Sequence, residues 1–409
     1  MIQATLANTQ FSSLLPSQIA VIRQNYDTKT PLQVTCDELH DCVTVLLNEA
    51  IQQAVESLDR KGLVKIQFVG PNNPTDTYPN DPDNHEIRSR VLGGKPVDDS
   101  SYSKNYFIVG LGGLARKSLT FGADIDFLVF PSDESSIPYT QALQKEIRFT
   151  LNKLLKQNDL PFKTDDMMTD LVEYHVPPEQ VPDKLLVPER ETYDPEFQAS
   201  WRESTITSRV MRDVEFLCGD KEAYKKFAEI IKPRLYPYDA KGNILNAEGV
   251  VLIRELLETP LKEKLEQLKL SLPKAEEDPA GFISKLEYKD DVMRLFHLYT
   301  WLTRANEGIE NPNYNTVLKT RIVRNSLDPQ TADDLSLSHD FFTSVLITLR
   351  DIRKKVIPIK KPDNERITTD IQPQIAEKCK LDVHQFRKAF VTYLNSTVRI
   401  MSTDLFPEV

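Results

Sequence analysis

A pair of alternating aspartates between two apolar runs constrains the fold of this chain more than any other feature. The runs 106–109 and 127–130 have the length and the β-branched and aromatic composition of strands. Because side chains alternate along an extended chain, Asp124 and Asp126 are expected on one face and Ile125 on the other. Neighbouring carboxylates repel each other unless a cation lies between them. Oxygen ligands favour a hard ion, so the pair predicts a site for Mg²⁺ or Mn²⁺.

A glycine pair stands before these aspartates, and ten residues separate it from them. Without Cβ atoms at Gly112 and Gly113, the backbone can turn sharply and a phosphate can approach its N–H groups. Arg116, Lys117 and Ser118 follow in the same turn. The Arg116 guanidinium is expected either to neutralise phosphate charge or to pair with a nearby acid. A phosphate cradle beside a metal-binding pair of carboxylates predicts nucleotide chemistry, with a nucleoside triphosphate as substrate.

The arrangement resembles the nucleotidyltransferase superfamily shared with DNA polymerase beta, whose motif is a small-residue pair, a spacer and Asp-x-Asp. More narrowly, the run 112–126 resembles the PII-uridylyltransferase branch, which includes nucleotidyltransferases associated with CBS domains. Ala123 replaces the serine that is usual in that motif. The resemblance implies that Asp124 and Asp126 hold Mg²⁺. It also implies transfer of a nucleoside monophosphate to a hydroxyl acceptor, by analogy a hydroxyl on a protein.

A third carboxylate is implied by the same resemblance. The segment 139–158 has the apolar periodicity of a helix, and 161–167 follows as the next expected strand. Its Phe-Lys-Thr-Asp resembles the Phe-Arg-x-Asp of glutamine synthetase adenylyltransferases, which makes Asp165 the candidate third metal ligand and catalytic carboxylate. Asp166 and Asp170 are neighbouring alternatives, because a slip of one residue turns a side chain to the opposite face. Alternatively, this segment is an acidic loop that supplies no metal ligand. The chain could then bind nucleotide and metal but would not activate the acceptor.

A weaker similarity lies at 208–220, which resembles a helix of the same branch that ends in Leu-x-Gly-Asp. Asp213, Gly219 and Asp220 match that pattern, whereas Glu215 stands where arginine is usual. A helix C-cap at Gly219 explains the glycine equally well. On either interpretation we expect a helix that ends at Gly219.

The expected fold class is α+β, in which helices surround a small mixed-sheet nucleotidyltransferase core and an all-α domain follows. Residues 1–62 are predicted as an N-terminal helical segment, because 36–59 repeats apolar side chains at helical spacing. Residues 63–240 are predicted as the nucleotidyltransferase domain, with a further strand at 64–69. Residues 241–409 are predicted as the helical C-terminal domain.

Charge and composition limit the partners. A net charge of −10 opposes general nucleic-acid binding, which normally needs a concentrated basic surface. No apolar run reaches the ~18 residues of a membrane span, and the N-terminus lacks a secretory-signal pattern. Four cysteines without paired spacing indicate a reducing compartment, so we expect a cytoplasmic protein without a membrane partner. Cys36, His40 and Cys42 are a poor metal site, because helical spacing does not bring all three to one face.

Two other classes of function stay open. One is an enzyme that modifies a small molecule, since the acidic balance suits a cationic substrate. The other is a non-catalytic nucleotide-binding or scaffold protein in which the helical half binds the partner. Asp124 and Asp126 argue against this second class, whereas the lack of a third carboxylate would favour it.

Overall fold

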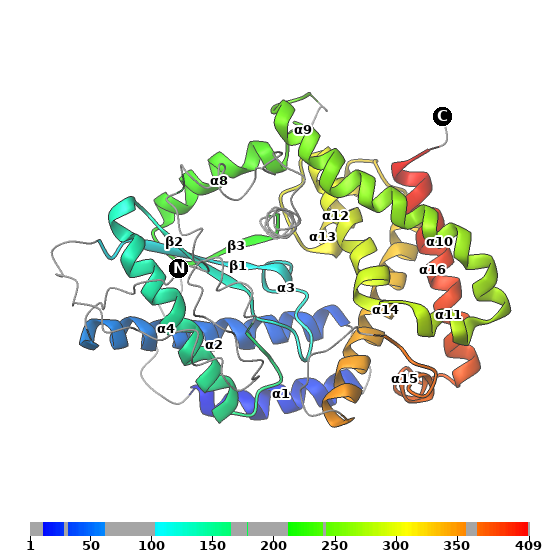
Figure 1. The fold of residues 1–409 in the computed structure, drawn as a ribbon, viewed down its shortest axis with the longest axis horizontal. Helices are drawn as coiled ribbons and strands as arrows, with labels where there is room; N and C mark the ends of the chain where they lie inside the picture. The colour runs from blue at the N-terminus through cyan, green and yellow to red at the C-terminus, as the bar shows by residue number, and fades with distance from the viewer. Residues whose placement is uncertain are drawn as a thin grey trace, which may run out of the picture.

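The computed structural model describes residues 11–27, 32–61, 103–164, 178, 212–239, 243–356 and 366–407. In these ranges the molecule is mostly helical, with one small sheet and a helical C-terminal region beside it (Figure 1). The α+β class is thus confirmed in its broad form. The described sheet is antiparallel, where the sequence predicted a mixed one, because its central strand is hydrogen-bonded on both sides to strands of opposite direction.

The sheet has the order β2-β1-β3. Its strands are β1 (Tyr106–Leu111), β2 (Phe127–Pro131) and β3 (Val214–Gly219). The first two confirm the strands predicted from the apolar runs. The β1–β3 register shifts between Ile108 and Val109, so this pair contains an irregularity that the β1–β2 pair lacks.

Strand β3 shows that the helix predicted to end at Gly219 is wrong. Its sequence, Val-Glu-Phe-Leu-Cys-Gly, is rich in side chains that favour strands, and its backbone pairs with β1. Gly219 closes the strand with φ +99, and Asp220 then begins a helix, α8 (Lys221–Leu235). The Asp220 carboxylate accepts two backbone N–H groups of the first turn at 3.0 Å. The Leu-x-Gly-Asp pattern therefore marks the start of a helix rather than its end.

Helices cover both faces of the sheet. On one face lie α1 (Phe11–Asp27), α2 (Leu32–Lys61) and α4 (Ile137–Gln157), and on the other lies α8 (Figure 1). Alternation along the strands separates the two cores. Side chains on the first face include Ile108, Ile125, Phe127 and Val129, and those against α8 include Phe107, Val109, Leu128 and Phe130. Helices α2 and α4 confirm the two helices predicted at 36–59 and 139–158.

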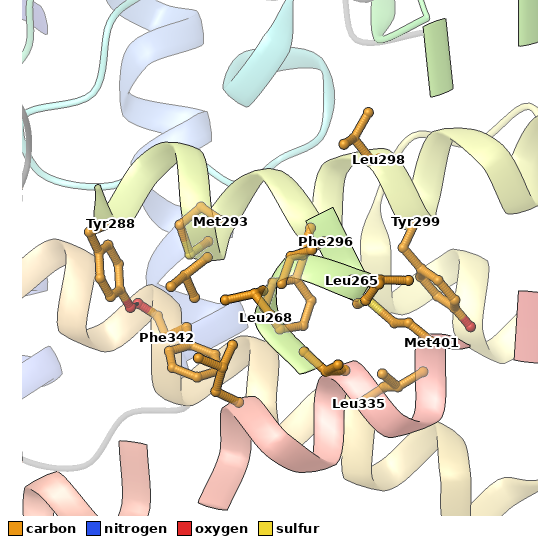
Figure 2. Packing of buried hydrophobic residues seen from close by; sticks show 14 of the residues in the cluster. Leu265, Leu268, Tyr288, Met293, Phe296, Leu298, Tyr299, Leu335, Phe342 and Met401 are labelled. Atoms are coloured by element: carbon orange, nitrogen blue, oxygen red, sulfur yellow. Dashed lines mark hydrogen bonds between the residues drawn. The ribbon is translucent and has the colours of Figure 1, made fainter. Parts of the chain in front are cut away.

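The C-terminal region is a set of packed helices. It contains α9 (Ala247–Ile253), α10 (Thr259–Glu277), α11 (Pro279–Lys285), α12 (Arg294–Glu307), α13 (Tyr314–Val323), α14 (Pro329–Val356), α15 (Gln372–Lys378) and α16 (Val383–Leu405), with π-helical turns at Arg254–Glu258 and Tyr288–Met293. Figure 2 shows how their apolar side chains meet, among them Leu265, Phe296, Leu335, Phe342 and Met401. The hydroxyl of Tyr288 donates to the carbonyl of Phe342 at 2.5 Å, so this buried phenol is satisfied.

Some predictions fall outside the described residues, namely the strand at 64–69 and the last three residues of the strand at 161–167. The first four residues of 161–167 are described, and they form an isolated bridge at Lys163 rather than a strand. The predicted domain limits stay predictions. Of the helices in the described ranges, none combines the length and the apolar character that a membrane span requires.

Candidate functional site

The predicted metal-binding aspartates lie in an extended segment that leads into β2. Asp124 and Asp126 are half-buried, whereas Ile125 between them is 2% exposed and belongs to the core beneath α2 and α4. Burial thus alternates as in an extended chain, and both carboxylates flank a side chain that faces the other way. The strand itself begins only at Phe127, so the pair precedes β2 rather than lying within it.

Gly112 lies directly against Asp126. Its φ is +54, and a Cβ at this position would be 3.1 Å from Oδ2 of Asp126. One residue earlier, the Leu111 N–H donates to the carbonyl of Asp126 at 3.0 Å and extends the β1–β2 pairing to this point. The glycine turn and the carboxylate are therefore held together by backbone, and a side chain on Gly112 would crowd the acid.

The turn after β1 is a single helical turn, α3 (Gly112–Ala115). It is closed by the N–H groups of Arg116 and Ser118, which donate to the carbonyls of Gly112 at 3.0 Å and Gly113 at 2.9 Å. Lys117 has φ +54 and its side chain is exposed. The structure thus places all five predicted phosphate-binding residues in one tight loop beside Asp126.

The Arg116 side chain reaches away from this loop to a buried acid. Its Nη1 donates to Oδ2 of Asp213, a carboxylate with no exposed surface. Trp301 Nε1 at 2.8 Å and Arg304 Nη1 at 2.7 Å also donate to Asp213. In addition, Asn313 Nδ2 donates to the Arg116 carbonyl at 3.0 Å. This geometry favours the pairing of Arg116 with an acid over contact with a phosphate.

Sequence reasoning missed this buried polar cluster. Arg304 is 1% exposed, and its Nη2 also donates to the carbonyls of Arg212 at 2.9 Å and Glu310 at 2.8 Å. Its partner Asp213 is 91 positions away in the sequence, so no local pattern could join them. The resemblance did single out Asp213, but it gave no indication of what the carboxylate binds. The cluster joins the glycine turn, the start of β3 and α12.

The segment that leads to the predicted third carboxylate runs beside the aspartates. Lys163 forms a parallel bridge with Asp124, and its carbonyl accepts the N–H of Ile125 at 2.7 Å. Asp165 and its two alternatives lie outside the described residues, so the third ligand stays a prediction. Within the described ranges, no group of three or more His, Cys, Asp or Glu side chains is placed to hold a metal ion.

A cleft of about 800 Å³ opens beside the glycine turn. The turn contributes Ala115 and Lys117, β3 contributes its first three residues, and α8 contributes Tyr224. The remaining wall comes from α2, α13, α14 and the residues before α13. The lining is mostly polar and is drawn from segments far apart in the sequence. No sequence motif pointed to this cleft, because only the packing of the helical region against β3 creates it.

A histidine stands behind the wall of this cleft. His40 of α2 is buried, and its Nε2 lies 3.2 Å from Oε2 of Glu215, which lines the cleft. The hydrogen bond with Glu215 raises the pKa of His40 above its usual value, against the opposing effect of burial. Cys36 and Cys42 are free thiols, and burial raises the pKa of Cys36 to about 12, which disfavours the thiolate that a metal needs.

Comparison with known proteins assigns the chain to no family. No protein-family model matches it, and no curated protein matches it. The resemblance to nucleotidyltransferases therefore rests on the sequence of the glycine turn and of the aspartate segment.

Proposed function

We propose that this chain is a Mg²⁺-dependent nucleotidyltransferase that transfers a nucleoside monophosphate from a triphosphate to a hydroxyl group on a protein. The observation that carries the proposal is the close approach of Gly112 to Asp126. A backbone turn without side chains stands beside a carboxylate, so a phosphate at the turn and a cation at the acid would be neighbours. A metal-bound nucleoside triphosphate carries both of these groups.

Asp124 and Asp126 would hold the metal ion, Mg²⁺ or Mn²⁺, with Asp165 as the candidate third carboxylate. Two carboxylates are a partial ligand set, and this suits Mg²⁺, which keeps several waters and takes other ligands from substrate phosphates. When bound, such an ion neutralises phosphate charge and lowers the pKa of an acceptor hydroxyl. The chain itself contributes the position of both acids, because Ile125 anchors the segment in the core.

The residues of the glycine turn would have different roles in substrate binding. Gly112 and Gly113 would offer backbone N–H groups to the phosphates. Lys117 is exposed at the cleft and would supply a mobile positive charge. Arg116 acts indirectly, because its guanidinium is bound to Asp213 and so holds the turn in place. The Ser118 N–H donates within the loop, and its hydroxyl would be the group that contacts the phosphates.

Label transfer tests the proposal. The full chain is incubated with Mg²⁺, each of the four nucleoside triphosphates labelled at the α-phosphate, and a cell lysate as the source of acceptors. Wild type should label a protein, whereas Asp124→Asn/Asp126→Asn should not. The matched control is Glu222→Gln, which neutralises a carboxylate that is 77% exposed on α8. Equal labelling by wild type and the double variant would show that the aspartates have no part in the mechanism. If only small molecules were labelled, the acceptor would be a metabolite and not a protein.

A non-catalytic nucleotide-binding protein is the second candidate. It is favoured by the commitment of Arg116 to Asp213, which takes away a cation that could stabilise charge on a transferring phosphate. Calorimetric titration with Mn²⁺ and a non-hydrolysable triphosphate separates the two candidates. Binding that depends on Asp124 and Asp126, without label transfer to any acceptor, would identify this second function.

A further inference from the structure

The outer edge of the sheet faces the cleft. In the described part of the chain, β1 is the only strand that pairs with β3, so β3 forms an edge of the sheet. Val214, Glu215 and Phe216 of this edge strand line the cleft. An edge strand presents a row of backbone N–H and C=O groups, and these are a template for pairing with another extended chain.

The wall opposite this edge is polar and held in place. Ser336 Oγ of α14 donates to Asn315 Oδ1 of α13 at 3.2 Å, and Asn315 Nδ2 donates to Gln33 Oε1 of α2 at 3.0 Å. Gln33 Nε2 in turn donates to Asp37 Oδ1 at 2.8 Å. This chain of hydrogen bonds crosses three helices and fixes the side chains that a ligand would meet. Such a wall suits a ligand rich in hydrogen-bonding groups more than an apolar one.

The charges in the cleft are mixed. Three carboxylates and two ammonium groups line it, from Asp37, Glu215, Asp333, Lys117 and Lys319. A polyanion would meet more negative than positive side chains, so this lining does not suit nucleic acid. Phe216 and Tyr224 add an aromatic pair with ring centroids 5.0 Å apart. Backbone pairing, mixed charge and an aromatic contact together match the groups of a polypeptide.

We propose that the cleft binds an extended polypeptide segment, which adds as a further strand to the edge of β3 that no described strand covers. Main-chain hydrogen bonds to β3 supply affinity, and side chains of the segment contact the polar wall. The three cleft-lining residues of β3 span about 10 Å, enough for a short segment. Ala115 and Lys117 line the same cleft and follow Gly112 and Gly113 in the chain. A hydroxyl side chain of the segment is therefore presented near the turn, and this acceptor role rests on the proposed function.

The probe for this site is a displayed library of random peptides, selected on the immobilised full chain without nucleotide. Affinities of synthetic selected peptides are measured by fluorescence anisotropy. Lys319→Trp places a bulky ring in the cleft from an exposed position and should weaken binding at least about tenfold. Lys269→Trp is the matched control, since Lys269 is exposed on α10 and does not line the cleft. The proposal would be overturned if Lys319→Trp weakened the binding of none of the selected peptides.

The binding mode has its own readout. In a strand that pairs on one side, alternate backbone amides face the partner. N-methylation of one alternating set of peptide amides should abolish binding, whereas methylation of the other set should preserve it. Equal effects of the two sets would exclude strand addition. The Asp124→Asn/Asp126→Asn variant should bind the peptides as tightly as wild type does. Peptide binding is therefore tested independently of transferase activity.

Discussion

Arg304 of α12 and Asp213, just before β3, form an ion pair with almost no exposed surface. The distance from Nη1 to Oδ1 is 2.7 Å, and the two side chains are 1% and 0% exposed. Burial of a charge is unfavourable unless the charge is paired and hydrogen-bonded, and here both conditions are met. Because Arg116 of the glycine turn shares the same carboxylate, one buried acid ties the proposed active site to the helical region.

Asp213→Asn should therefore be strongly destabilising. It would leave the Arg116 and Arg304 guanidinium groups facing a neutral amide inside the protein. We expect the free energy of unfolding to fall by about 3–5 kcal/mol, as when one partner of a buried ion pair is removed. Urea denaturation followed by circular dichroism measures the change.

The control for this experiment is Glu222→Gln, which breaks a surface pair with Lys225. Such exposed pairs contribute little to stability, so the control should unfold close to wild type. If Asp213→Asn behaved like the control, the cluster would not hold the turn against α12.

The His40–Glu215 pair should make stability depend on pH. Because the hydrogen bond with Glu215 raises the pKa of folded His40 above its unfolded value of about 6.5, protonation favours the folded state. This contribution is complete below the unfolded pKa and is lost as pH rises through the folded pKa. Glu215→Gln should lower the folded pKa of His40, which a titration of the imidazole by NMR detects. It should also destabilise the protein more at acidic than at alkaline pH.

Asp41→Asn is the matched control for that titration. Asp41 lies 3.5 Å from Nδ1 of His40, but its side chain is 86% exposed, so solvent screens its charge. We expect a smaller change in the pKa of His40 than Glu215→Gln produces. An unchanged titration in Glu215→Gln, or a larger change in Asp41→Asn, would show that the buried partner does not set this pKa.

The two glycines of the turn should respond differently to alanine. At Gly112 the added Cβ would crowd Asp126 in a left-handed backbone, so we expect about 1–3 kcal/mol of destabilisation and weaker Mn²⁺ binding. At Gly113 the Cβ would meet Leu119 Cδ2 at 3.5 Å, an ordinary contact. Gly113→Ala should thus keep its stability and its Mn²⁺ affinity. If Gly113→Ala lost triphosphate binding but kept its stability and Mn²⁺ affinity, a phosphate must approach Gly113 closely. Normal Mn²⁺ binding by Gly112→Ala would show that Gly112 does not contribute to the metal site.

Local patterns explain what the sequence predicted correctly. Strands β1 and β2, helices α2 and α4, and the turn between the two strands each follow from apolar spacing or from glycine within one short stretch. The contact of Gly112 with Asp126 also follows, because adjacent antiparallel strands bring their connected ends together.

Features that depend on distant segments could not be predicted. The partners of Asp213 come from the turn before β2 and from α12, and the cleft needs α2, β3, α13 and α14 together. The helix predicted at 208–220 failed for another reason. The composition of 214–218 favours a strand, whereas the Leu-x-Gly-Asp pattern resembles a helix end, and Gly219 suits the end of a strand as well as the end of a helix.

Gly219→Ala distinguishes these two roles of the glycine. Gly219 has φ +99, and its Cβ would lie 2.2 Å from the Tyr106 carbonyl oxygen and 2.8 Å from Phe107 Cα, backbone atoms of the neighbouring strand that cannot yield. Strain and overpacking together should cost about 3 kcal/mol or more in urea denaturation. Gly308 is a true helix C-cap, with φ +60 and a nearest atom at 3.4 Å, so Gly308→Ala should cost only about 1 kcal/mol. Equal losses in the two variants would favour the helical cap and count against the pairing of β3 with β1.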